Sequence, residues 1–115
     1  MEKTAIEVCS NWLDAHAKEM HARGIDLERK GEAEGKAAFW LYGSHHLVDI
    51  CVWNHAFCLD VLAFESKTNE MVFSEAGSCE TPQGVCDRLE RFWSWYVSQQ
   101  LSITHKSLDT EPATR

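Results

Sequence analysis

The chain has 115 residues, of which 44% are hydrophobic and 25% are charged, and its formal net charge is −7. This balance is typical of one globular domain and excludes a disordered chain. The negative charge disfavours binding to nucleic acid or to an anionic membrane, and it favours either a basic partner or simple solubility.

The first predicted element is an amphipathic helix over residues 4–23. Its inward positions recur at three- and four-residue steps, as expected for one face of a helix. These positions are Ile6, Cys9, Leu13, His16 and Met20, with Trp12 beside them. Gly24 follows Arg23 and can adopt the left-handed conformation that ends a helix. The segment lacks the apolar run of a signal peptide.

Short strands separated by turns make up the middle of the chain. Strands are predicted over residues 25–28, 37–42, 46–53, 57–64 and 71–73. A polar turn is predicted over residues 31–36, and His45 and His46 are expected to be solvated next to another turn. Brief turns between consecutive strands indicate an antiparallel meander of four to five strands.

A second helix is predicted over residues 82–99. Thr81 is a suitable N-cap and Pro82 suits the first helical position. Apolar residues then recur at helical spacing from Val85 to Tyr96. The periodicity fades after residue 99, so residues 100–115 are expected to form a flexible tail. The chain is thus predicted to be a single α+β domain over residues 1–99, with this helix packed on the sheet.

Strand alternation sorts the predicted sheet into two faces. One set is wholly apolar and should contact a helix: Phe39, Leu41, Val48, Ile50, Val52, Leu59, Val61 and Ala63. The opposite set mixes aromatic residues with carboxylates: Trp40, Tyr42, Asp49, Cys51, Trp53, Cys58, Asp60, Leu62 and Phe64. Within it we expect the second helix to cover Leu62 and Phe64, and Asp49 and Asp60 to be exposed because an unpaired charge is costly to bury. The exposed aromatic area would mark a contact site.

No catalytic, cofactor or metal motif is found. The cysteine pairs 51/58 and 79/86 are wider than zinc-ligand spacing, and the scattered glycines match no phosphate-binding loop. Cys58 with His55, or Asp49 with Asp60, would be the only candidate catalytic pairs, and neither comes with a recognisable cleft. We therefore predict that the chain is not an enzyme and binds no metal or cofactor.

The five cysteines are an odd number. An odd count without a signal peptide favours reduced thiols, and hence a cytoplasmic protein. No apolar run approaches the length of a membrane span.

Four short strings stand out in this layout: Asn-Trp-Leu at 11–13, Arg-Gly-Ile-Asp-Leu-Glu at 23–28, Val-Asp-Ile-Cys-Val-Trp at 48–53 and Cys-Leu-Asp-Val at 58–61. With the order of elements, they make residues 8–98 resemble the TriTu-type immunity proteins of bacterial polymorphic toxin systems, which include contact-dependent growth inhibition. The aromatic run at 92–96 and the segment after Ser98 are additions to that pattern. The resemblance implies a cytoplasmic antidote that binds one toxin domain, often a nuclease, and blocks its active site or substrate surface.

A partner-binding surface follows from these interpretations. An acidic inhibitor can mimic a polyanion and associate quickly with a basic toxin. The expected contact residues are Trp40, Tyr42, Asp49, Trp53, Asp60, Glu65, Glu70 and Glu75. We expect a monomer that forms a one-to-one complex with the toxin domain and binds neither nucleic acid nor membrane.

Two alternatives stay open: a dimeric secretion chaperone of the type III kind that wraps an extended effector segment, and a small ligand-binding domain or enzyme with a pocket against the aromatic second helix.

Overall fold

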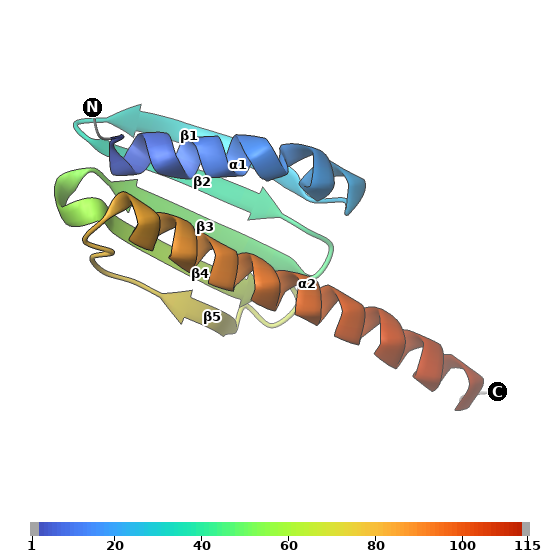
Figure 1. The fold of residues 1–115 in the computed structure, drawn as a ribbon. Coiled ribbons are helices and arrows are strands. Elements are labelled where there is room, and N and C mark those ends of the chain that lie inside the picture. The colour runs from blue at the N-terminus through green and yellow to red at the C-terminus, as the bar shows by residue number, and fades with distance from the viewer. Residues whose placement is uncertain (1–2, 114–115) are drawn as a thin grey trace.

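A computed structural model describes residues 3–113, with side chains as far as residue 101. Its elements follow in chain order: α1 (Ala5–Ala22), β1 (Asp26–Ala33), β2 (Lys36–Tyr42), β3 (His46–Trp53), a short 3₁₀ turn (His55–Phe57), β4 (Cys58–Glu65), β5 (Met71–Glu75) and α2 (Pro82–Ala113). The five strands form one antiparallel sheet in chain order. Both helices lie on the same face of this sheet (Figure 1). The predicted α+β fold, with its meander and its packed C-terminal helix, is confirmed.

Backbone and side-chain hydrogen bonds cap helix α1 at both ends. The Glu7 amide donates to Thr4 Oγ1 at 3.2 Å, and the Thr4 amide donates back to Glu7 Oε1 at 2.9 Å, which is a capping box. At the other end Gly24 has a φ of 77°, and the Ile25 amide donates to the Met20 carbonyl at 2.8 Å. The predicted glycine stop is therefore confirmed.

Strand β1 is longer than predicted. Residues 31–33, predicted as part of a polar turn, continue β1 and pair with β2, so that only Glu34 and Gly35 form the turn. An edge strand is held by backbone pairing and needs no apolar alternation, which is why its polar residues resembled a loop. Gly31, with a φ of 123°, follows the bulge at Lys30.

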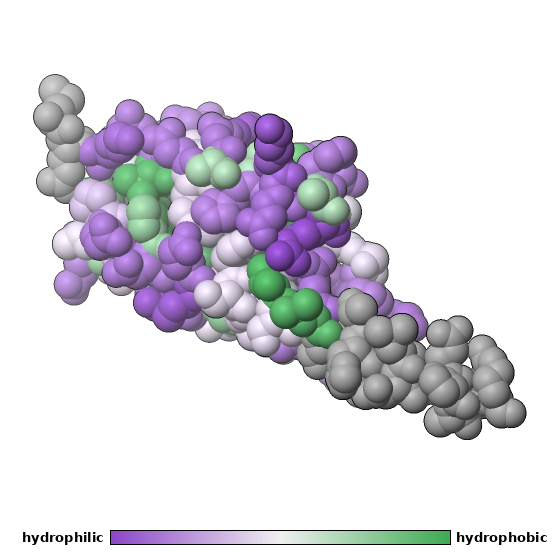
Figure 2. All heavy atoms as spheres, turned by 45° about the vertical axis from the view of Figure 1, so that its right-hand side comes forward, coloured by the Kyte–Doolittle hydropathy of each residue, from purple (hydrophilic) through white to green (hydrophobic). Residues whose placement is uncertain are grey.

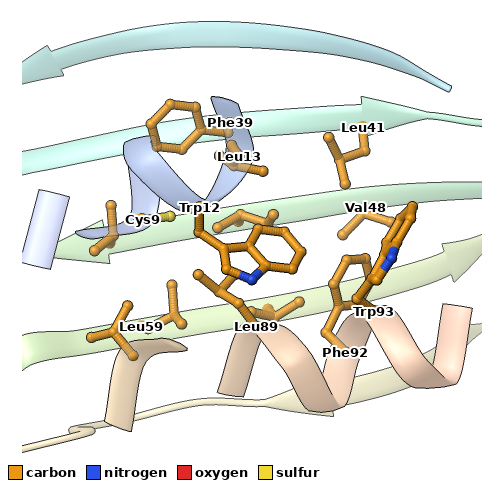
Figure 3. Close-up of a cluster of buried hydrophobic side chains, with 14 of the residues drawn as sticks. Cys9, Trp12, Leu13, Phe39, Leu41, Val48, Leu59, Leu89, Phe92 and Trp93 are labelled. Atoms are coloured by element: carbon orange, nitrogen blue, oxygen red, sulfur yellow. The ribbon is translucent and has the colours of Figure 1, made fainter. Parts of the chain in front are cut away.

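The core lies between the helices and the sheet. Side chains of the apolar strand set are all at most 3% exposed. Trp12 of α1 and Phe92 and Trp93 of α2 point into the space above β3 and β4 (Figure 3). The alternation that predicted a helix-facing set is therefore confirmed.

Helix α2 begins as predicted but is longer. The Gly84 amide donates to Thr81 Oγ1 at 3.0 Å, which identifies Thr81 as the cap. The backbone is helical as far as Ala113, so a helix replaces the loose segment predicted for residues 100–113, and residues 114–115 lie outside the described part. Over the described residues, neither helix has the length and apolarity needed to cross a membrane.

His46 is buried, whereas it was predicted to be solvated. It is the first residue of β3, and the alternation of that strand directs its side chain into the helix-facing layer, where it is 5% exposed. Its ring lies 5.4 Å from the Trp95 ring centroid and 5.5 Å from that of Tyr96. Burial lowers the pKa of His46; His45 adds to this effect, and Glu65 opposes it.

We expect this histidine to make folding stability depend on pH. An imidazole in the unfolded chain titrates near pH 6.5. Because the pKa of His46 is lower in the folded state, the unfolded state binds more protons as pH falls below that value, and stability decreases. Urea unfolding should therefore give a lower free energy at pH 5.5 than at pH 7.5. His46→Phe should reduce this difference, whereas the exposed control His55→Gln should keep it; an unchanged difference in His46→Phe would contradict the assignment.

Candidate functional site

The sheet face turned away from both helices is not covered by any other element of residues 3–113 (Figure 1). We call it the open face, and on its three central strands it consists of Lys36, Ala38, Trp40, Tyr42, Leu47, Asp49, Cys51, Trp53, Cys58, Asp60, Leu62 and Phe64. The prediction that α2 covers Leu62 and Phe64 is wrong. α2 joins α1 on the opposite face, where the wholly apolar strand set offers the larger driving force for burial.

The open face is more apolar than an ordinary solvent-facing surface. Leu47 lies between Tyr42 and Phe64 in register, and Asp49 lies between Trp40 and Leu62. Nearly all of these side chains are only partly buried, by their neighbours in the sheet, and Tyr42 is 37% exposed. The opposite side is different: polar residues cover most of the surface seen in Figure 2, and apolar residues are confined to small areas.

Trp40 lies near the centre of the open face under a lysine from the neighbouring strand. Lys30 Nζ is 4.3 Å from the Trp40 ring centroid, within the range of a cation–π contact. Tyr42 packs edge-on against the same indole at 6.0 Å, and its hydroxyl donates to Glu28 Oε1 at 2.7 Å. This hydrogen bond raises the pKa of Tyr42. Lys30 was not among the predicted site residues, because the strand predicted over residues 25–28 ends before it, and it lies at a bulge of β1.

Trp53 lies at the far end of β3 and is arranged in the same way. Lys36, its register partner on β2, places Nζ 5.1 Å from the Trp53 ring centroid. Both open-face tryptophans therefore already accept a cation from the β1–β2 hairpin. The contact between Lys36 and Trp53 could have been predicted from the register of β2 and β3, in which these two residues are opposite each other.

Asp49 on β3 and Asp60 on β4 are partly buried on the open face. The Cys51 thiol lies between them in the sheet and contacts Asp49 Oδ1 at 3.5 Å. Burial, with the Asp49 charge, raises the pKa of Cys51, so that thiol is protonated and unreactive at neutral pH. Asp60 Oδ1 accepts the Gly77 amide at 3.1 Å.

The remaining predicted contact acids lie away from the open face. Glu65 is opposite His46 at the end of β4 and accepts the Thr68 hydroxyl at 3.0 Å, and Glu70 is exposed in the turn that follows. Glu75 points toward α2. Hydrogen bonds from Arg91, at 2.7 Å and longer, hold the pKa of Glu75 below its ordinary value, and Arg88 lies 3.5 Å away. The structure thus brings together Trp40, Tyr42, Asp49, Trp53 and Asp60, but not these three.

Four carboxylates elsewhere in the fold form ion pairs with lysine or arginine side chains of the same chain. Ion pairs join Asp14 to Arg29, Glu19 to Arg23, Glu28 to Lys30, and Glu75 to Arg88 and Arg91. Within residues 3–101 no basic group lies within 4.0 Å of Asp49 or Asp60, and the same holds for other carboxylates such as Glu65 and Glu70. Two carboxylates are therefore left without a counter-ion on the face that carries the aromatic residues.

A hollow of about 320 Å³ lies at one end of the open face. It is lined by Trp53, His55, Cys58, Asp60 and Gly77, so it contains the Cys58/His55 pair considered from the sequence.

All five cysteines are free, and burial raises the pKa of Cys9 to about 12. Among the described residues, no three His, Cys, Asp or Glu side chains are placed so that they could hold a metal ion.

Comparison of the chain with protein-family models, with curated proteins and with solved structures finds no match.

Proposed function

We propose that this protein binds a basic partner protein on its open face, and that the partner is a toxin domain which it neutralises in the cytoplasm. The observation that supports the proposal most is the open face itself. A five-stranded sheet whose second side carries tryptophan, tyrosine, leucine and phenylalanine is left without a covering layer from residues 3–113. Apolar patches of this kind mark contact surfaces on soluble proteins.

The aromatic residues suit the centre of such an interface. Trp40 and Trp53 are rigid, partly buried by sheet neighbours, and surrounded by polar groups. Tryptophan and tyrosine dominate binding hot spots because they bury a large area with few rotatable bonds. An interface centred here would bury about 1,200–2,000 Å² in total.

The charges favour a basic partner. Within residues 3–101 Asp49 and Asp60 have no counter-ion, whereas Glu75, which is also partly buried, has two arginines. A cationic side chain from a partner would supply the missing charge and would make the contact specific. The net charge of −7 acts at longer range and speeds the encounter. That the basic partner is a toxin domain rests on the resemblance to immunity proteins.

The direct test is to measure binding to any toxin domain found among the products of the neighbouring genes. By isothermal titration calorimetry we expect Asp49→Lys to raise the Kd at least about 100-fold, because it places a cation opposite the partner's cations. Trp40→Ala should raise the Kd about 30-fold or more. The matched control is Asp87→Lys, an equal charge change at an exposed α2 residue, which should change the Kd less than about threefold.

Cells exposed to the toxin should lose protection in the same order as the affinities. If Asp49→Lys and Trp40→Ala bind and protect as the unaltered protein does, the open face is not the interface. Light scattering of the protein without its partner should give a monomer; an obligate dimer would instead favour the secretion chaperone.

A further inference from the structure

The hollow at the end of the open face has the dimensions of a site for one side chain. Its volume of about 320 Å³ lies at the lower end of the range for small-molecule pockets. It is bounded by the Trp53 indole, the Asp60 carboxylate and the loop at Gly77, with His55 and Cys58 completing the wall. It is thus a small recess within a larger contact surface.

The Asp60 carboxylate is held in place but is not neutralised. Its Oδ1 accepts the Gly77 amide at 3.1 Å, and no basic group of residues 3–101 lies within 4.0 Å of it. A single hydrogen bond from an amide leaves most of the acceptor capacity of a carboxylate free. A donor that carries positive charge would therefore gain a charge-assisted hydrogen bond there.

Several hydrogen bonds hold the loop at Gly77, next to Asp60. The Gly77 carbonyl accepts both the Leu59 amide, at 3.0 Å, and Arg88 Nη1, at 2.9 Å. Arg88 also donates to the Leu59 carbonyl at 2.7 Å, so that one buried guanidinium ties the loop to β4 and α2. A recess held in this way loses little conformational freedom when it is filled.

Trp53 gives the recess an aromatic wall of the kind that attracts cations. Its ring centroid lies 5.1 Å from Lys36 Nζ, within the range of a cation–π contact. A planar guanidinium can both stack on an indole and donate two hydrogen bonds to a carboxylate, whereas an ammonium group acts as a point charge.

We propose that the hollow between Trp53 and Asp60 receives one arginine side chain of the basic partner. This inference rests on the proposed function, since it names the group by which the partner is recognised. Asp60 then supplies the counter-charge and Trp53 the stacking surface, while Arg88 and Gly77 keep the carboxylate in position.

Small arginine derivatives test the hollow without the partner. ¹⁵N-labelled protein would be titrated with N-acetyl-arginine amide, with the citrulline compound, which has the same shape without the charge, and with the lysine compound. We expect the arginine compound to shift the Trp53 indole and Gly77 amide signals with an affinity at least tenfold higher than that of either control. Asp60→Asn, which keeps an oxygen to accept the Gly77 amide, should abolish the preference, and Asp87→Asn should keep it.

Equal affinities for the arginine and citrulline compounds, or shifts confined to other parts of the protein, would overturn the inference. An equal affinity for the lysine compound would overturn the assignment to arginine. The two proposals fail separately. If Asp49→Lys abolishes toxin binding but the arginine compound is not preferred, the arginine site is wrong and the proposed function stands. If the arginine compound is preferred but no toxin domain binds, the arginine site stands and the proposed function is wrong.

Discussion

Replacing Arg88 with leucine is expected to lower the free energy of unfolding by about 3 kcal/mol, because it removes a largely buried, charged donor from the Leu59 and Gly77 carbonyls and one of the two arginines beside Glu75. The side chain is 13% exposed and donates to the carbonyls of Leu59 and Gly77, while its Nε lies 3.5 Å from Glu75. Leucine fills a similar apolar volume but satisfies none of these groups. The melting temperature should fall by roughly 10 °C in a domain of this size.

Arg91 provides the matched control for this change. It pairs with the same carboxylate but is 55% exposed, so Arg91→Leu should cost less than about 1 kcal/mol. If the two variants unfold at the same urea concentration, the buried guanidinium does not stabilise the loop as described.

Replacing Phe92 with alanine is expected to cost about 3–5 kcal/mol, the range for removing a large side chain from a closed core. Phe92 is 0% exposed, and its ring lies 5.8 Å from the Phe73 ring and 5.9 Å from the Tyr96 ring. It projects from α2 toward the sheet (Figure 3), so its loss would leave a cavity between the helix and the sheet. Urea denaturation followed by circular dichroism measures the loss.

Trp40→Ala, an equally severe truncation on the open face, should cost clearly less than Phe92→Ala while weakening partner binding. Trp40 is partly buried by strands and Lys30 alone, with no helix over it. If the two truncations destabilise the protein equally, the assignment of the two faces would be contradicted.

The fold could be predicted from the sequence wherever one periodicity ran through a whole element. Residues from His46 to Trp53 alternate strictly between apolar and mixed positions, and β3 has these bounds. The second half of β1 could not be predicted in this way, because an edge strand with solvent on one side tolerates polar residues and glycine. His46 was likewise mispredicted. Its burial follows from the alternation of β3, but its position next to a turn led to the prediction that it is solvated.

The site was predictable in part for a related reason. Strand alternation alone placed Trp40, Asp49, Trp53 and Asp60 on one face. It could not show that Glu75 is neutralised, because Arg88 and Arg91 belong to a helix that follows later in the chain. Nor could it show the hollow, whose wall at Gly77 depends on contacts among β4, the loop after β5 and α2.

The order of the strands also bears on how quickly the protein becomes active. Each strand pairs only with its neighbours in sequence, so the sheet can assemble hairpin by hairpin with little loss of chain entropy at each closure. Long-range steps are left to the helices, such as the contact of Trp12 with Glu90 across 78 residues. A newly synthesised copy would thus complete its open face early, which would suit the antidote role proposed above.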